Sequence, residues 1–259
     1  YRQYLDVGAR HNLPLMLSTP TWRASRQRIV DAGLADRDVN GDNFRFLDDL
    51  RKSYKDYSRK VVIGGIMSCK GDAYDRNQTL EADEAYAFHA WQAQKLAKAG
   101  VDFLMACTLP ALEEAVGLAR AMAKTNIPYV VSFVVRPEGT LLDNTPLKDA
   151  LTAIDSAATP KPFAYMVNCT HASNFRSALL HKVNSSSLVR DRMKGLLANT
   201  AALTPEELDN ADSLVEEEPE VFGRDLAAIH KELGTRILGG CCGTDQRHIN
   251  DLAARLAGA

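Results

Sequence analysis

The chain has 259 residues, of which 46% are hydrophobic and 25% charged, and its formal net charge is -2. This composition is typical of a globular protein with enough chain to bury a sizeable core. The near-neutral balance and the scattered basic residues argue against nucleic-acid binding. No apolar run reaches the ~20 residues of a membrane helix. Residues 1–12 lack the apolar core of a signal peptide.

Seven short apolar runs predict strands. They are rich in Val, Ile, Leu, Phe and Met and do not alternate cleanly with polar residues. Strands buried on both faces have this pattern, and they belong to parallel sheets. The predicted strands are residues 13–18, 61–66, 101–106, 128–134, 163–168, 193–198 and 235–240.

Helical patterns lie between these runs. A helix-like segment opens the chain, and another follows Thr79 and ends at Gly100, which fits a C-cap. Thr145-Pro146 predicts an N-cap followed by a first-turn proline. Ile249, Leu252, Ala253 and Leu256 share one face of a last helix because they are spaced at i, i+3, i+4 and i+7.

Residues 204–220 carry two further signals. Thr204 and Glu207 form a capping-box pattern with Pro205 at the first helical position. The acidic run at 216–220 carries no motif, and we expect a solvated loop before a helix.

The repeated strand-then-helix order, without linkers, predicts a single domain over residues 1–259. Such repeats form either an open doubly wound α/β sheet or a (β/α)8 TIM barrel. A barrel needs one strand more than the seven runs supply. We favour the barrel, with its first strand absent from the given sequence, for reasons that come from the cysteines.

The chain has five cysteines, an odd number that is poor evidence for a disulfide framework. A reducing compartment is therefore favoured, and we expect a cytoplasmic protein. Cys241 and Cys242 directly follow the last predicted strand in RILGGCCGTDQRHI, and Cys169 follows the fifth in MVNCTHAS. The carboxyl ends of barrel strands carry the active site. Three thiols on that face predict a three-cysteine metal cluster.

The adjacent thiols have two alternative interpretations. A disulfide between adjacent cysteines is strained, because their Cα atoms are only ~3.8 Å apart. Small buried hydrophobes are a second alternative. The glycines of GGCCG permit close backbone approach, which a bare core pair would not need. Cys69 and Cys107 also follow strands, and inert packing is favoured for both. Trp22 follows the first strand and either lines a pocket or packs.

Three thiolates with an open fourth position favour Zn²⁺ in a catalytic site. His171 is the nearest candidate for a closing fourth ligand, and we do not favour it. A substrate thiol at the open position would be held as thiolate at neutral pH. The natural reaction is then attack by that sulfur on an electrophilic carbon.

GGCCGT, with VNC about seventy residues upstream, resembles the zinc-binding signature of the homocysteine S-methyltransferase family. QAQKLAKAGVDFLMACTLPALEEA and SFVVRPEGTLLDNTPL are similar to further family segments and give weaker support. The resemblance implies a (β/α)8 barrel and zinc on Cys169, Cys241 and Cys242. It also implies that homocysteine sulfur is the fourth ligand.

Two further residues are candidates for binding substrate. Glu138 matches the family's acidic residue that holds the amino group of homocysteine; a solvated loop glutamate is its alternative. Asn168 precedes a metal ligand, and we expect it to orient that ligand or to bind substrate backbone groups. A turn asparagine at a strand end is the alternative for Asn168.

The sequence departs from the family pattern at three places. No Asp-Gly-Gly segment is found, Cys107-Thr108 stands where Glu-Thr is usual, and residues 68–72 replace a Gly-Pro segment. The last two changes fall near the expected substrate face. They bear on the identity of the substrate more than on the zinc.

The predicted function is a zinc-dependent S-methyltransferase that moves a methyl group from an onium-type donor to homocysteine, giving methionine. Its expected partners are homocysteine or a similar thiol and a small methyl donor, with no nucleic acid or membrane. The sequence leaves the donor and a homo-oligomer open. The alternatives are a methyltransferase acting on a different thiol and a non-catalytic barrel that binds zinc or thiols.

Overall fold

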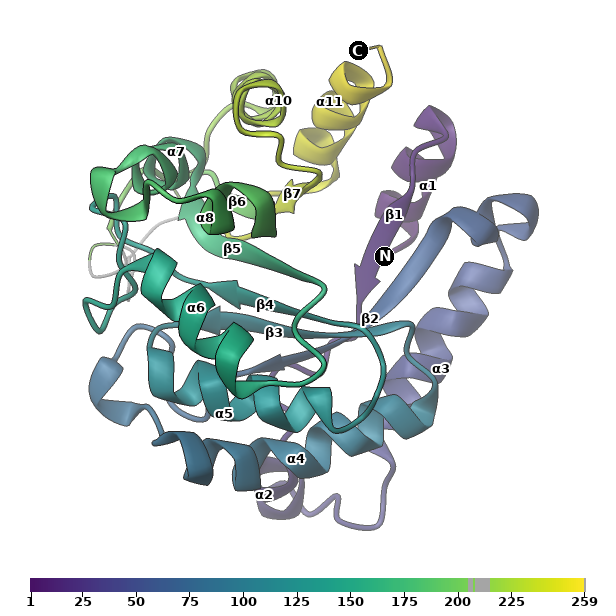
Figure 1. The fold of residues 1–259 in the computed structure, drawn as a ribbon. Coiled ribbons are helices and arrows are strands. Elements are labelled where there is room, and N and C mark those ends of the chain that lie inside the picture. The colour runs from purple at the N-terminus through teal and green to yellow at the C-terminus, as the bar shows by residue number, and fades with distance from the viewer. Residues whose placement is uncertain (205–206, 208–214, 259) are drawn as a thin grey trace. The chain divides into compact units, whose positions relative to one another are not determined.

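A computed structural model describes residues 1–204, 207 and 215–258 (Figure 1). All seven predicted strands are present, and four of them, β2, β3, β5 and β6, run further than predicted toward their carboxyl ends. The strands are β1 (Leu15–Ser18), β2 (Val61–Ser68), β3 (Phe103–Leu109), β4 (Tyr129–Phe133), β5 (Ala164–His171), β6 (Met193–Asn199) and β7 (Ile237–Gly240).

Helices connect the strands, and no described helix combines the length and apolar character needed to cross a membrane. The α-helices are α1 (Arg2–His11), α2 (Arg26–Asp31), α3 (Val39–Lys52), α4 (Ala82–Ala99), α5 (Leu112–Ala123), α6 (Leu147–Ala157), α7 (Ala172–Leu180), α8 (Ser187–Arg192), α10 (Pro219–Leu233) and α11 (Gln246–Ala257). Short 3₁₀ turns are η1 (Lys55–Lys60), η2 (Arg76–Gln78) and η3 (Lys182–Asn184).

One predicted helix end is confirmed, and another differs by one residue. Gly100 caps α4 with a left-handed φ of 99°. Helix α6 begins one residue later than predicted, because the carbonyl of Pro146 accepts its first hydrogen bonds, from the amides of Asp149 and Ala150. Pro146, rather than Thr145, therefore occupies the cap position.

Within the 204–220 segment, the predicted capping box is confirmed. The Glu207 amide donates to Thr204 Oγ1 at 3.3 Å, and Glu207 Oε2 accepts from the Thr204 amide at 2.8 Å. These are the two bonds of a capping box. Pro205 lies outside the described residues. The acidic run is a loop only as far as Glu218, because α10 begins at Pro219, inside the run.

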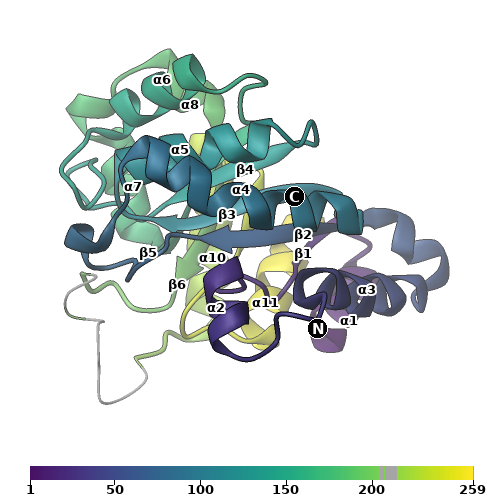
Figure 2. The same ribbon diagram turned by 90° about the horizontal axis from the view of Figure 1, so that it is seen from below.

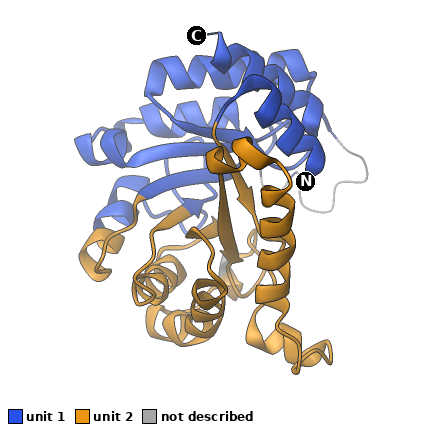
Figure 3. Cartoon of the chain, turned by 90° about the vertical axis from the view of Figure 1, so that its right-hand side faces the viewer, with its two compact units in different colours: residues 1–13, 132–152, 164–259 blue, residues 14–131, 153–163 orange. Residues whose placement is uncertain are grey.

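The chain forms two compact units, coloured separately in Figure 3. Unit 2 comprises residues 14–131 and 153–163. Within it, β1, β2, β3 and the start of β4 are neighbours in that order, and the β1–β2 and β2–β3 pairs are parallel. Helices α4 and α5 lie side by side in two views (Figures 1 and 2).

Unit 1 comprises residues 1–13, 132–152 and 164–259. Within it, the end of β4 is followed by β5, β6 and β7 in that order, and the β5–β6 and β6–β7 pairs are parallel. Helix α11 packs against both α1 and α10.

Strand order within each unit follows chain order without reversal. A doubly wound sheet reverses its order at a switch point, whereas a (β/α) barrel does not. The winding is therefore of the barrel type, with seven strands among the described residues. An absent first strand and a single domain both remain predictions.

The middle strands are buried as the sequence predicted, whereas the first and last strands are less buried than predicted. Every residue of β4, and all but one of β3 and β5, are buried. In β7 all residues are half-buried, and in β1 all but one are. Among the described strands, β1 and β7 each have a strand neighbour on one side only. Less of their surface is therefore covered.

A buried carboxylate organises the loop that follows β2. Glu114 on α5 has no exposed surface, and its Oε1 accepts from the Lys70 amide at 2.7 Å and lies 2.9 Å from His89 Nε2. Its Oε2 accepts from the Leu80 amide at 3.3 Å. One side chain thus fixes both ends of residues 70–80. The sequence offers no signal for this role, because Glu114 is one of two adjacent glutamates.

Replacing this carboxylate tests its importance. We expect Glu114→Ala to lower the free energy of unfolding by about 3 kcal/mol, because buried donors lose their acceptor and His89 loses its charged partner. Glu113→Ala, at the exposed neighbouring position, is the control and should change it by less than about 0.5 kcal/mol. Urea unfolding of both variants measures the difference. Equal effects would show that Glu114 has no special part in stability.

Candidate metal centre

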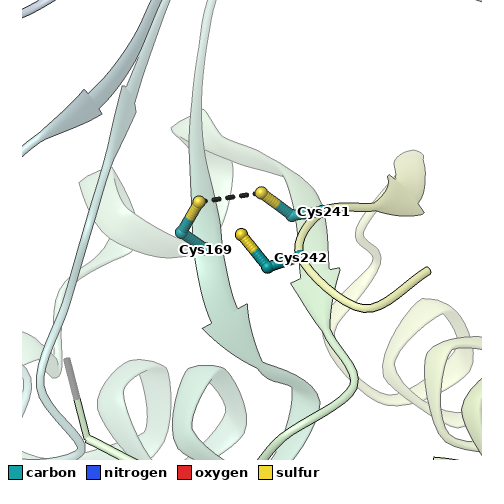
Figure 4. Close-up of side chains that lie close together, drawn as sticks. All are labelled: Cys169, Cys241 and Cys242. Atoms are coloured by element: carbon teal, nitrogen blue, oxygen red, sulfur yellow. Dashed lines mark hydrogen bonds between the residues drawn. The ribbon is translucent and has the colours of Figure 1, made fainter. Parts of the chain in front are cut away.

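Cys169, Cys241 and Cys242 come together in unit 1, as the sequence predicted. Their sulfur atoms all lie within 4.8 Å of one another, and those of Cys169 and Cys241 are 2.8 Å apart (Figure 4). Two sulfurs bound to one zinc at ~2.3 Å can be at most ~4.6 Å apart, so the spacing is close to that of a shared metal. Among the described residues these are the only three metal-binding side chains that group in this way.

Cys169 lies inside β5 rather than after it, at a β-bulge. In the pairing of β5 with β6, Asn168 faces Leu197 and Thr170 faces Ala198, so Cys169 is the extra residue. Its φ is +52°, a left-handed conformation that non-glycine residues rarely adopt. Bulges redirect a side chain and are common beside active sites. Here the bulge breaks the regular alternation at the residue that carries the thiol.

The Cys241–Cys242 segment is held by β6. The Cys241 amide donates to the Ala198 carbonyl at 2.7 Å, and the Cys242 amide donates to Asn199 Oδ1 at 3.2 Å. The Cys242 carbonyl in turn accepts from the Thr200 amide at 3.2 Å. Because β6 pairs with both β5 and β7, one strand positions the cysteines that lie in or directly after the other two.

The glycine after the two cysteines is required by its surroundings. Gly243 has a φ of +83°, and a Cβ atom there would lie 1.9 Å from Thr200 Oγ1. The chain therefore turns so tightly at this point that only glycine fits. This is the close approach that the GGCCG pattern predicted.

Proximity of the sulfurs changes their acidity. Hydrogen bonds from the thiols of Cys169 and Cys241 lower the pKa of Cys242 to about 3. The pKa of Cys241 is raised well above its ordinary value by its hydrogen bonds with Cys169 and Cys242, and then by burial. The cluster therefore accommodates one negative charge readily and resists a second. A divalent cation would remove that resistance.

The donor set fits zinc. Thiolate sulfur selects soft and borderline metals, and three protein ligands leave a fourth position for substrate. The two alternatives to a metal centre are not supported. All five cysteines are free, so no disulfide joins Cys241 to Cys242, and Cys242 is exposed rather than packed in the core.

The structure does not bring His171 or the other two cysteines into the cluster. His171 Nδ1 lies 2.8 Å from Ser173 Oγ and accepts from the Ser173 amide at the start of α7. Cys69 and Cys107 are buried in unit 2. Burial, with the nearby Glu114 charge, raises the pKa of Cys69 to about 11. At neutral pH Cys69 is therefore an unreactive thiol. Trp22, for which a packing role was one alternative, is 54% exposed.

Glu138 lines a pocket together with Cys169. The pocket has a volume of about 140 Å³, and its wall also includes Arg136, Asn174 and Leu203. A larger cavity of about 590 Å³ lies among α1, α10 and α11 and contains none of the predicted site residues. The smaller pocket is thus the one that joins the predicted metal ligand to the predicted amine-binding carboxylate.

Glu138 lies in a tight turn that is held in place by a side chain from outside the turn. The Gly139 amide donates to the Arg136 carbonyl at 2.9 Å. The Gly139 carbonyl accepts from Asn184 Nδ2 at 2.8 Å, and this amide group also donates to the Ala178 carbonyl. Asn184 is buried, so the turn is tied to the end of α7. The exposed carboxylate of Glu138 is therefore carried by a backbone segment that is held in place.

Three buried polar side chains surround the thiols. Asn168 Nδ2 donates to Cys169 Sγ at 3.4 Å, and Asn168 Oδ1 accepts from Ser132 Oγ at 2.6 Å. Asn199, 2% exposed, holds the Cys242 amide, and its Nδ2 has no hydrogen-bond partner. Sequence reasoning named Asn168 and missed the other two. Asn199 directly follows the predicted strand 193–198, a signal that could have found it, whereas Ser132, inside a strand, gives no signal.

The match to known proteins agrees with this geometry. The family model described as "Homocysteine S-methyltransferase" matches residues 1–256. The chain belongs to the homocysteine S-methyltransferase family. The resemblance stated from GGCCGT and VNC is thereby confirmed.

Relatives within the family are distant. Over 236 residues the chain is 25% identical to homocysteine S-methyltransferase YbgG of Bacillus subtilis, covering 89% of this chain and 71% of that protein. Over 277 residues it is 27% identical to betaine–homocysteine S-methyltransferase 1 of Rattus norvegicus, covering 99% of this chain. The chain spans only 63% of the length of the rat protein.

A solved structure shares the fold. The crystal structure of the homocysteine methyltransferase MmuM from Escherichia coli, in its metallated form, aligns with a TM-score of 0.75. The alignment covers 98% of this chain and 83% of that chain at 22% identity. At this identity the likeness establishes the fold, in agreement with the barrel-type winding.

Two glycine substitutions test whether the turn at Gly243 requires glycine. Gly234, which caps α10, has a φ of +67° and would meet nothing within 4 Å, so Gly234→Ala should cost only about 1 kcal/mol of stability. Gly243→Ala adds a clash with Thr200, and we expect a loss of at least about 2 kcal/mol. Urea unfolding of both variants compares the losses. Equal losses would show that the turn tolerates a side chain.

Proposed function

We propose that this chain is the homocysteine-binding domain of a zinc-dependent S-methyltransferase that moves a methyl group from an onium-type donor to homocysteine, giving methionine. The observation that carries the proposal is the convergence of the three thiols, of which Cys242 is exposed, in a chain of this family. The MmuM protein of Escherichia coli, whose fold this chain shares, was crystallised in a metallated form.

Cys169, Cys241 and Cys242 would hold the zinc. When bound, zinc supplies a Lewis-acid centre that keeps a thiol deprotonated at neutral pH. Cys242 is the exposed member, so the cluster is open to a ligand on that side. Asn168 occupies both ends of its amide with Ser132 and Cys169, which supports a role in orienting the ligand rather than in binding substrate.

Glu138 would hold the ammonium group of the acceptor. The carboxylate lines the same small pocket as Cys169, so one molecule could reach both. An acceptor with a thiol at one end and an amine at the other matches the two groups. A charge-assisted hydrogen bond from the amine would fix the acceptor's orientation.

The reaction then needs no acid or base from the protein in the transfer step. A lone pair of the acceptor sulfur forms the new S–C bond, and the donor's onium–C bond breaks with its electron pair returning to the donor. The thiol proton leaves to solvent before transfer. The chain contributes alignment of the reacting atoms and exclusion of water from the pocket.

Activity is tested directly with zinc-loaded protein. Betaine, S-methylmethionine and S-adenosylmethionine are offered with homocysteine and with a panel of other thiols, and methylated products are quantified. Methionine formation with one donor is the expected result. A different thiol preferred over homocysteine would overturn the assignment of the acceptor. No product with any pair, from protein that binds zinc, would favour the non-catalytic alternative.

Metal content is the second test. Reduced protein should contain about one zinc per chain, and each of Cys169→Ser, Cys241→Ser and Cys242→Ser should lose it. Cys69→Ala and Cys107→Ala are controls that remove buried thiols outside the cluster and should keep the metal. Elemental analysis of purified protein measures the zinc.

The fold should survive the loss of the metal. Cys241→Ser should still unfold cooperatively, because the core of a barrel does not depend on this site. Loss of cooperative thermal unfolding in Cys241→Ser would contradict that expectation.

Glu138 is tested by binding. We expect Glu138→Gln to weaken homocysteine binding to the zinc-loaded protein by about tenfold, because a charge-assisted hydrogen bond is lost. Binding of 4-mercaptobutyrate, which lacks the amine, should not change. Glu216→Gln, another exposed carboxylate of unit 1, is the control. Titration calorimetry gives both dissociation constants, and equal weakening for the two thiols would show that Glu138 does not bind the amine.

A further inference from the structure

A buried serine stands behind the first thiol of the cluster. Ser132 lies on β4 and has no exposed surface. Its hydroxyl donates to Asn168 Oδ1 at 2.6 Å, and Asn168 Nδ2 donates to Cys169 Sγ at 3.4 Å. The three residues form a chain of hydrogen bonds from β4 to the sulfur. All of them belong to unit 1.

The sulfur sets the direction of this chain, and the donating serine hydroxyl holds the amide in that orientation. A carboxamide has a donating and an accepting end, and a thiolate can only accept. With the Ser132 hydroxyl directed at Oδ1, the NH₂ end of Asn168 faces the sulfur. The opposite orientation would place the amide oxygen against the thiolate and remove the N–H···S bond. Because Asn168 is only 3% exposed, water cannot readily take over the serine's role.

Cys169 is the ligand that most needs such support. It stands at the bulge with a φ of +52°, a conformation that costs energy and persists only where the surroundings impose it. Hydrogen bonds to a ligating sulfur also withdraw charge from it and change the metal's electronic properties.

We propose that Ser132 is a positioning residue that acts through Asn168 to hold and polarise the Cys169 sulfur as a metal ligand. The inference rests on the proposed metal site and deepens it. Ser132 touches neither the metal nor the substrate in this role. Its effect reaches the site through the amide of Asn168.

The test uses the protein loaded with Co²⁺, whose thiolate-to-metal charge-transfer band reports on the sulfur ligands. Three variants form a cycle: Ser132→Ala, Asn168→Ala and the double variant. Ser68→Ala is the matched control, since Ser68 is a buried serine of unit 2 whose hydroxyl donates to the Cys107 carbonyl. Zinc affinity is measured in parallel by competition with a chromophoric chelator.

We expect Ser132→Ala and Asn168→Ala to move the band in the same direction, to lower energy, because a thiolate without its hydrogen bond gives up an electron more easily. Each should weaken zinc binding by about tenfold, the range found when outer partners of metal ligands are removed. The double variant should match Asn168→Ala, since the serine acts only through the asparagine. Ser68→Ala should change neither quantity.

Three outcomes would overturn the proposal: an unchanged band and zinc affinity in Ser132→Ala, additive losses in the double variant, or an equal effect of Ser68→Ala. Thermal unfolding of each variant without metal shows whether a loss is general. If Ser132→Ala fails to fold, the Asn168→Asp variant tests the proposal instead. It keeps the acceptor for Ser132 but cannot donate to the sulfur, and an unchanged band would overturn the proposal. Absence of any thiolate band in the unaltered protein would instead overturn the metal site itself.

Discussion

The site depends on the close approach of three sulfur atoms that cannot all be ionised without a cation. Cys169, Cys241 and Cys242 lie within 4.8 Å of one another, and their mutual hydrogen bonds favour one thiolate and oppose a second. Such an arrangement could release protons and bind a metal in their place. The backbone bulge, the tight glycine turn and the buried amides around the cluster all keep the sulfurs at that spacing.

Strand β6 is the common support. It pairs with β5, which carries Cys169, and with β7, which leads into Cys241 and Cys242. Ala198, Asn199 and Thr200 bind the backbone or hold the turn of the second ligand segment. A strand that contributes no cysteine thus fixes the distance between the cysteine-bearing segments, which a parallel sheet allows because neighbouring strands end at the same edge.

Outside the thiols, one group of polar side chains is exposed at the pocket and another group is buried and supports its neighbours. Glu138 is exposed at the wall of the small pocket, whereas Asn184 beneath it is buried and holds only backbone. Asn168 and Ser132 are buried and form one chain to Cys169. This division explains why a few accessible groups could act with precision, since their orientation is set by buried partners.

The sequence by itself determined the seven strands, the three cysteines that group together and the family, because each depends on local pattern: unbroken apolar runs, and a GGCC segment after the last of them. It placed Glu138 and Asn168 through resemblance and strand ends. Only the tertiary structure decided that Cys169 occupies a bulge, that Gly243 faces Thr200, and that Ser132, Asn184 and Asn199 stand behind the site. Those contacts join residues 36 to 45 positions apart in the chain. Local periodicity carries no information about partners at such separation. A serine or asparagine in the sequence does not indicate which distant residue its side chain will contact.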